Sequence, residues 1–192
     1  MIYSTVKKVC DAGVCEEGRR DSYAALERDG LKDTDRISAV WCLDNCGVPG
    51  TLWALKYVDR SSEAEAIQAL WKFILKIVDR SSGAQYLKHL TKLELLSQGH
   101  RFTLEGTREM LRLASVCEGY SPMHRAQALM IYRAMDQKED LNVRAVEVFQ
   151  QAMEIASYSE GHAVASKDRW KAEYQWMFQT LRAILSGEQH GN

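Results

Sequence analysis

The stretch EAEAIQALWKFILKIVD, residues 63–79, decides the fold class that the sequence predicts. At a helical period of about 100° per residue, its apolar side chains cover most of the circumference and leave a narrow polar strip. A helix that is apolar almost all round is normally buried between other elements. We therefore expect a central helix here, whose main apolar stripe is formed by Ile67, Leu70, Trp71, Ile74, Leu75 and Val78.

Helical patterns continue on both sides of this stretch. Glycines such as Gly30 and Gly47 follow predicted helical runs, where a left-handed residue closes a helix. No run alternates with a period of two, so we expect no sheet. The predicted fold is all-α, either a single compact helical bundle or a stack of antiparallel helical hairpins, with about 8–10 helices. The expected helices are residues 2–11, 16–29, 35–46, 51–59, 63–79, 83–98, 104–118, 122–137, 142–159 and 163–186.

Length and charge set the broad class of protein. A chain of 192 residues suits one domain, so we expect a single helical domain at 1–187 and a flexible tail at 188–192. The 25 basic and 26 acidic side chains give a net charge of -1, which predicts no general attraction to nucleic acid or anionic lipid. The N-terminus does not resemble a secretory signal, and no apolar run is long enough to span a membrane. Five sparse cysteines are typical of the reduced cytoplasm.

A seven-residue motif occurs twice, as KYVDRSS at 56–62 and KIVDRSS at 76–82. In each copy the last serine is followed three residues later by Glu or Gln, which predicts a capping box that closes a helix start. We therefore expect Ser62 with Glu65, and Ser82 with Gln85, to form helix-to-helix corners at the two ends of the central helix. The aspartates fit less well, because a carboxylate is unfavourable at a helix C-terminus. Asp59 and Asp79 are expected to pair with an arginine of the other copy or to face a partner.

The cysteines offer a metal site as an alternative to simple packing. Cys10 and Cys15 are five positions apart, and Cys42 and Cys46 are four apart. Four thiolates could hold zinc, but structural zinc sites favour tighter knuckles, and buried free cysteine is a common small hydrophobe. We expect packing, no metal and no cofactor. Known nucleophile, metalloprotease and phosphate-binding motifs are also absent from the sequence, so no catalytic residue is nominated.

One segment loosely resembles a helix-turn-helix. ISAVWCLDNCGVPGTLWALKYV, within residues 35–59, places a glycine turn between two short helical patterns. The second pattern lacks the Arg, Gln or Asn side chains that read base edges. Leu43 also stands where a small residue normally permits close helix crossing. A core hairpin is the favoured interpretation, with DNA binding as an alternative and nucleic acid not expected as a partner.

The last helical pattern nominates a contact surface. Trp176 lies off the apolar stripe that contains Trp170, Tyr174 and Met177, so this helix either packs on two sides or uses Trp176 to anchor a partner. Arg169 and Ala172 are the neighbouring candidates. The expected function is a non-enzymatic, cytoplasmic, helical protein-interaction module of the adaptor, inhibitor or immunity type. The alternatives are an enzyme or a small-ligand protein that uses Cys or His residues, DNA binding through 35–59, and self-association into a homo-oligomer.

Overall fold

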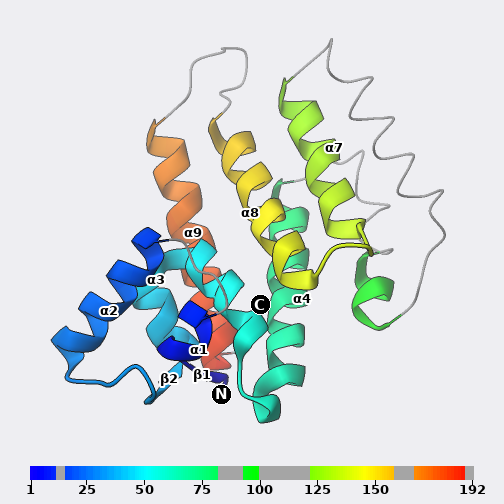
Figure 1. The fold of residues 1–192 in the computed structure, drawn as a ribbon. Helices are drawn as coiled ribbons and strands as arrows, with labels where there is room; N and C mark the ends of the chain where they lie inside the picture. Colours follow the sequence, from blue (N-terminus) through cyan, green and yellow to red (C-terminus); the bar gives the residue numbers. More distant parts are fainter. Residues whose placement is uncertain (12–15, 82–92, 100–121, 158–166, 189–192) are drawn as a thin grey trace. The chain divides into compact units, whose positions relative to one another are not determined.

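The structure is a computed structural model of the chain, and it describes residues 1–11, 16–81, 93–99, 122–157 and 167–188 (Figure 1). Helices account for 82% of the residues that the structure describes, which confirms the predicted all-α class. The predicted helices 83–98 and 104–118 lie wholly or mostly outside the described residues. The same is true of residues 189–192, which form most of the predicted tail.

The chain divides into two compact units. Unit 1 comprises Met1–Leu70 and Phe178–Asn192, and unit 2 comprises Trp71–Met177. The boundaries fall inside two long helices, α4 (Glu63–Ser81) and α9 (Lys167–Ser186). The single domain expected at 1–187 stays a prediction.

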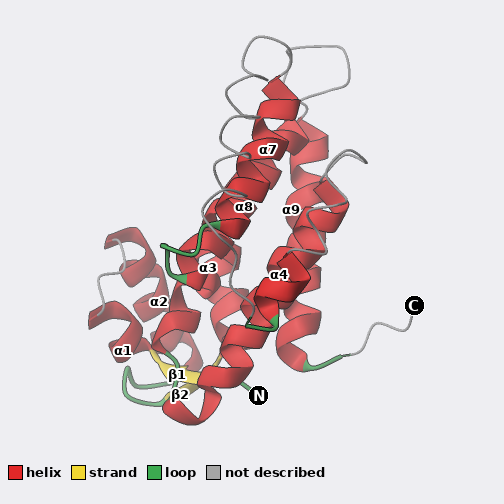
Figure 2. Cartoon of the chain, turned by 90° about the vertical axis from the view of Figure 1, so that its right-hand side faces the viewer, coloured by secondary structure: helices red, strands yellow, loops and turns green. Residues whose placement is uncertain are grey.

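Unit 1 contains a small sheet that the sequence pattern did not predict. Strand β1 (Tyr3–Thr5) pairs antiparallel with β2 (Arg36–Ser38), with Tyr3 opposite Ser38 (yellow in Figure 2). The expectation of no sheet was wrong because three-residue strands are too short to show a period-two pattern. The remaining elements of the unit are α1 (Val6–Asp11), α2 (Glu16–Asp29), α3 (Ala39–Ala54) and the short 3₁₀ turns η1 (Leu55–Tyr57) and η2 (Arg60–Ser62).

The core of unit 1 gathers side chains from several of these elements. α3 is kinked at Gly47, which has φ 68° and ψ −174° and interrupts the helix where the sequence predicts a break. Only glycine adopts this backbone conformation readily. Pro49 then follows, inside the second half of the helix. The buried cluster contains Val6, Val9, Cys10, Leu26, Ile37, Cys42 and Ala54.

The first copy of the repeated motif closes the free edge of β1. The backbone N–H of Asp59 donates to the Tyr3 carbonyl at 2.8 Å, and the Tyr3 N–H donates to Ser62 Oγ at 3.3 Å. The Asp59 carboxylate accepts from Arg36 Nε at 3.0 Å. The corner at 58–62 is therefore a tertiary clamp, and the aspartate in it has a partner within unit 1.

The predicted capping box at Ser62 and Glu65 is replaced by other contacts. The Ser62 hydroxyl is used by Tyr3, and Glu65 forms an ion pair with the N-terminal amine at 2.8 Å. The start of α4 is closed instead by η2, in which the N–H groups of Ser62 and Glu63 donate to the carbonyls of Asp59 and Arg60. A 3₁₀ turn is a common way to satisfy the free donors of a helix start.

The second copy of the motif has a different structure. Its residues 78–81 continue α4 as helix through Ser81, two residues beyond the predicted end of the helix at 79. Ser82 and Gln85, the second predicted capping box, lie outside the described residues. Asp79 is exposed on this helix, and none of the described residues forms an ion pair with it.

Unit 2 is built from the second half of α4, the first half of α9, and a helical hairpin. α7 (Pro122–Met135) and α8 (Leu141–Ser157) lie side by side, joined by a short turn (Figure 1). The buried face of α4 in this unit contains Phe73, Ile74, Ile77 and Val78, whereas Leu75 of the predicted stripe is only partly buried. In the part of α4 that belongs to unit 1, Ile67 of the same stripe is exposed.

A buried arginine closes the α7–α8 turn. Arg144 is 5% exposed, and its Nε donates to the Ala134 carbonyl at 3.1 Å, near the end of α7. Its guanidinium lies 4.7 Å from the centre of the Trp71 ring. Burial lowers the pKa of Arg144 to about 10. The carbonyl end of α7 and the Trp71 ring both attract positive charge, so they offset the cost of burying the cation.

Replacing Ser62 tests the clamp on β1. Ser62→Ala leaves the Tyr3 N–H without its acceptor, so we expect a loss of about 1–2 kcal/mol in the free energy of unfolding. The measurement is urea denaturation followed by circular dichroism. Ser61→Ala, at the exposed serine next to it, is the matched control and should change stability by less than about 0.5 kcal/mol. Equal effects of the two substitutions would contradict the clamp.

Replacing Arg144 tests the buried cation. Arg144→Met keeps much of the side-chain volume but removes the donor to the Ala134 carbonyl, so we expect a loss of about 1–3 kcal/mol in the free energy of unfolding. Arg60→Met, at an exposed arginine of η2, controls for the loss of one charge. A thermal and urea denaturation series that finds the two variants equally stable would show that Arg144 does not hold the turn.

Candidate functional site

Two of the three sequence-nominated residues of α9 line a cleft in unit 2. The cleft has a volume of about 450 Å³ and is lined by the last turns of α4 and α8 and the first turns of α9. This volume is in the range of sites that hold a side chain or a small molecule. Arg169 and Ala172, both predicted candidates, line the cleft and are joined there by Arg80 and Glu173.

Arg80 is held in a fixed orientation at the cleft. Its Nε donates to both carboxylate oxygens of Glu173, at 3.0 and 3.1 Å, and its guanidinium lies 4.3 Å from the centre of the Trp176 ring. The Glu173 side chain is 14% exposed, whereas that of Arg80 is 47% exposed. Arg80 is therefore a cation that two neighbours orient and that solvent still reaches.

Trp176 packs against Arg80 on the side of α9 away from the apolar stripe. The sequence pattern nominated it as a partner anchor, but Arg80 covers a face of its ring and the side chain is only partly exposed. Cation–π stacking of this kind fixes the plane of a guanidinium. In the structure Trp176 supports Arg80, and a direct contact between Trp176 and a partner stays a prediction.

Arg80 and Glu173 were not predicted as site residues. Arg80 was expected only as an ion-pair partner of Asp59, the aspartate in the other copy of the motif. Its partner Glu173 is 93 residues away in the chain, so no local spacing could signal the pair. The clue in the sequence is the gathering of charged and aromatic residues on one side of a helix, since 169, 172, 173 and 176 are linked by steps of three and four.

A row of aromatic side chains lies on the same stretch of α9. Trp170 stacks on Tyr174 with ring centres 5.7 Å apart and an angle of 10°, and Tyr174 meets Phe149 of α8 edge-on at 6.1 Å. Trp170 is 44% exposed, although its spacing placed it in the predicted core stripe. The apolar stripe is buried from Met177 towards the C-terminus of the helix. The same spacing of apolar residues also continues towards the N-terminus, where the helix is no longer covered by the core.

The two motif aspartates do not share the cleft. Asp59 belongs to unit 1 and is bound to Arg36 at 3.0 Å. Asp79 precedes Arg80 on α4 but is not among the residues that line the cleft. Asp59 therefore has an arginine partner within its own unit, and pairing with the arginine of the other copy stays a prediction, as does a partner contact of Asp79.

Three of the cysteines lie together in unit 1. Cys10 and Cys42 are buried, Cys46 is partly buried beside them, and Ser22 Oγ lies 3.3 Å from Cys46 Sγ. A hydrogen bond from Cys42 lowers the pKa of Cys46 to about 7, and the same bond together with burial raises the pKa of Cys42. Burial raises the pKa of Cys10. The three thiols share one core, but among them only Cys46 combines partial exposure with easy ionisation.

A metal site is not visible at these thiols. Cys15, the fourth member of the predicted alternative, lies outside the described residues. Within the part of the chain that the structure describes, no three His, Cys, Asp or Glu side chains are grouped so as to hold a metal ion. The described helices also include none that is both long and apolar enough to cross a membrane.

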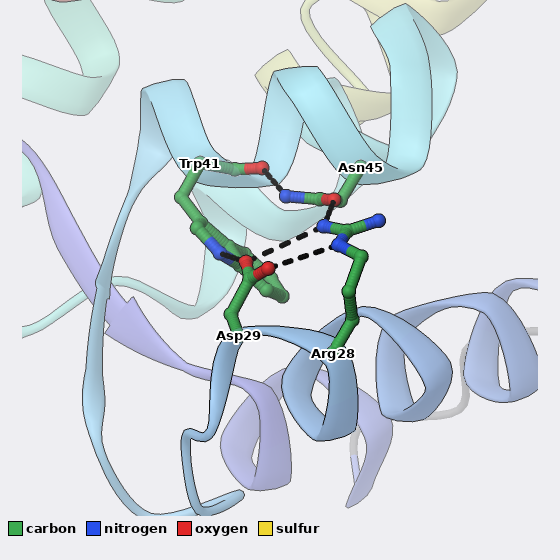
Figure 3. A network of polar contacts seen from close by, with 4 residues as sticks. All are labelled: Arg28, Asp29, Trp41 and Asn45. Carbon is green, nitrogen blue, oxygen red and sulfur yellow. Dashed lines mark hydrogen bonds and ion pairs between the residues drawn. The ribbon is translucent and has the colours of Figure 1, made fainter.

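One face of the helix that would read bases in the segment 35–59 is buried. Thr51, Leu52 and Leu55, on the helix that would read bases, are buried in unit 1. The first half of α3 is tied to α2 by a polar network, in which Asp29 accepts from Trp41 Nε1 at 2.7 Å and from Arg28 (Figure 3). Burial of the reading helix favours the core-hairpin interpretation, because base edges are read by exposed side chains in the groove.

The network in Figure 3 is a structural tie between α2 and α3. Arg28 also donates to Asn45 Oδ1 at 2.6 Å, and Asn45 Nδ2 donates to the Trp41 carbonyl at 2.8 Å. The hydrogen bonds from Arg28 and then Trp41 lower the pKa of Asp29. A carboxylate held ionised by two donors suits such a tie better than it suits proton transfer.

Comparison with known proteins does not assign a family or a function to this chain. No known protein family, curated protein or solved structure matches this chain. The function is therefore inferred from the contacts, burial and charge of the residues in the cleft and the thiol cluster.

Selective labelling tests the thiol cluster. Because the pKa of Cys46 is about 7, its rate of alkylation by iodoacetamide should reach half of its maximum near pH 7, and Cys42 and Cys10 should react more slowly. The measurement is mass spectrometry of fragmented peptides, which separates Cys42 from Cys46. Cys42→Ala removes the main cause of the shift and should move the Cys46 midpoint upward. A Cys46 midpoint near the ordinary thiol value of about 8.5 in the unmodified chain would contradict the arrangement.

Proposed function

We propose that the chain is a non-enzymatic binding module that holds another protein against the first half of α9 in unit 2. The observation that carries the proposal is the exposed, stacked Trp170 on the same stretch of helix as a cleft of about 450 Å³. A cytoplasmic setting is part of the proposal and follows from the sparse cysteines.

The chemistry of this surface suits protein recognition. Trp, Tyr and Arg are the residues most enriched at binding hot spots, and Trp170, Tyr174 and Arg80 are all present in it. Two of these are already fixed, Trp170 by the stack on Tyr174 and Arg80 by Glu173 and Trp176. Side chains that are ordered before binding lose less conformational entropy on binding, so more of their contact energy contributes to affinity.

An enzyme is the second candidate, and Cys46 is the observation that favours it. A partly exposed thiol with a pKa near 7 is the form in which cysteine acts as a nucleophile. It lacks a histidine base among its described contacts, which are Ser22 and Cys42. The interaction module remains the better-supported function, because the α9 surface combines a hollow with an exposed aromatic.

Site-directed photo-cross-linking tests the module. A benzophenone amino acid at Ala172, which is exposed and lines the cleft, should capture a specific protein in cells that make this chain. The same group at Ala24, an exposed alanine of α2, is the matched control and should not. Trp170→Ala should weaken capture at Ala172 by about tenfold or more, since truncating a hot-spot residue costs about 2 kcal/mol.

The outcomes separate the candidates. Adducts that are specific to position 172 and sensitive to Trp170→Ala support the binding surface. An identical set of adducts at positions 172 and 24, or none at position 172, contradicts it. The melting temperature of each variant is measured alongside, so that a loss of capture is not mistaken for unfolding.

A further inference from the structure

We propose that Cys46 is a site of reversible oxidation by hydroperoxides, and that Cys42 resolves the oxidised sulfur by forming a disulfide with it. The inference goes beyond the proposed function, because it concerns the thiol cluster of unit 1 and not the α9 surface. It follows from the position of two thiols one helical turn apart, from their unequal exposure and from the break in the helix that follows them.

The two thiols are placed for reaction by the helix that carries them. Cys42 and Cys46 are four positions apart on α3, so their side chains lie on the same face, one turn apart. Cys42 is 6% exposed, whereas Cys46 is only partly buried against the same core. An oxidant from solvent therefore reaches Cys46 first, and Cys42 stays protected until Cys46 has reacted.

The contacts of Cys46 suit oxidation. Ser22 Oγ lies 3.3 Å from its sulfur, and Cys42 forms a hydrogen bond with it. A hydroxyl and a thiol can both donate to a thiolate, and the bond from Cys42 is the main reason why the pKa of Cys46 is about 7. The thiolate is the form of cysteine that peroxides oxidise. The described contacts of Cys46 therefore supply a reactive sulfur and a second thiol, which is what a reversible oxidation needs.

The chemistry requires one hydroperoxide molecule, such as hydrogen peroxide. The thiolate sulfur of Cys46 attacks one peroxide oxygen, so that an S–O bond forms, the O–O bond breaks and the second oxygen leaves as hydroxide, which takes a proton from solvent. The sulfur is thereby oxidised to a sulfenic acid. The sulfur of Cys42 then attacks the sulfur of Cys46. An S–S bond forms, the S–O bond breaks, and the leaving hydroxide departs with the Cys42 proton as water.

The state of Cys46 controls the reactivity of Cys42. In the reduced cluster, the hydrogen bond to Cys46 is the main cause that raises the pKa of Cys42, followed by burial. A neutral sulfenic acid at Cys46 removes the thiolate that accepts this bond, so Cys42 then gives up its proton more easily. The disulfide therefore forms after Cys46 is oxidised and not before. Transient disulfides of this kind serve redox sensing in reduced compartments.

Closing the disulfide displaces the last turn before the break in α3. Side chains four apart on a helix have Cβ atoms about 5–6 Å apart, whereas a disulfide needs about 3.5–4.5 Å. The backbone can give way at Cys46 because Gly47 interrupts the helix immediately after it. Asn45, in the same turn, donates to the Trp41 carbonyl and accepts from Arg28 (Figure 3). Oxidation therefore loosens the tie between α2 and α3.

Peptide mapping of the full-length protein tests the proposal. Cleavage on the amino side of aspartate places the five cysteines on five separate fragments, residues 1–10, 11–20, 35–43, 44–58 and 79–135. After brief treatment with a small excess of hydrogen peroxide, fragments 35–43 and 44–58 should be recovered as one disulfide-linked pair. Treatment with dithiothreitol should separate them again.

Cysteine variants assign the two roles, with dimedone present to trap sulfenic acids. In Cys42→Ala the oxidised Cys46 has no resolving thiol, so the dimedone adduct on fragment 44–58 should rise at least about fivefold over the unmodified chain. In Cys46→Ala, oxidation of Cys42 should be at least about tenfold slower than that of Cys46 in the unmodified chain, because a buried thiol is inert. Cys10→Ala is the matched control, since it removes a buried thiol of the same cluster, and it should leave the linked pair unchanged.

The mapping can overturn either role. Linkage of fragment 44–58 to any fragment other than 35–43 overturns Cys42 as the resolving thiol. Absence of both the linkage and a dimedone adduct on fragment 44–58 overturns Cys46 as the oxidation site. Both results come from the unmodified chain, so they hold even if Cys42→Ala is unstable.

NMR tests the displaced turn through the indole N–H signal of Trp41, assigned with Trp41→Phe. This group donates to Asp29 in the tie between α2 and α3. Its signal should shift when the disulfide forms and return on reduction. A signal that stays in place while the linked pair forms overturns the loosening of the tie.

Discussion

Unit 1 depends on closing the outer edge of β1. A strand of three residues leaves backbone donors and acceptors unpaired on the side away from its partner strand, and such groups need partners when they are covered. The corner at 58–62 supplies them, through Asp59 N–H and Ser62 Oγ to the two backbone groups of Tyr3. This requirement holds the chain extended at Val58 and Asp59, and it ties the N-terminus to the start of α4.

The same requirement explains why one five-residue sequence has two structures. VDRSS at 58–62 is extended and then a 3₁₀ turn, whereas its second copy is helical through Ser81. Local propensity is nearly identical in the two places and is worth only tenths of a kcal/mol per residue. The first copy faces a strand edge that accepts its hydrogen bonds, and the second continues an established helix with Ile77 and Val78 buried in unit 2. Surroundings therefore outweigh propensity.

The two arginines of the motif have different roles because their backbones differ. In the first copy the arginine is exposed in a turn, and in the second it is held by Glu173 and Trp176 at a cleft.

Helical spacing placed Arg169, Ala172 and Trp176 on one side of α9, so part of the surface could be predicted. The partner of Arg80 could not, because an ion pair across 93 residues depends on which helices pack together. The thiol cluster could also be predicted only in part. Cys42 and Cys46 are one helical turn apart on the same helix, so their spacing brings them together, whereas Cys10 comes from a different helix and joins them only through packing.

The sequence by itself determined the helical class and most helix positions, including α2, α7 and the break at Gly47, because apolar periodicity and helix-ending glycines act locally. It also excluded the familiar catalytic motifs. Only the tertiary structure decided the short sheet, the role of each VDRSS copy, the exposure of Trp170 and the orientation of Arg80. These features depend on which backbone and charged groups, far apart in the chain, must satisfy one another once the helices have packed.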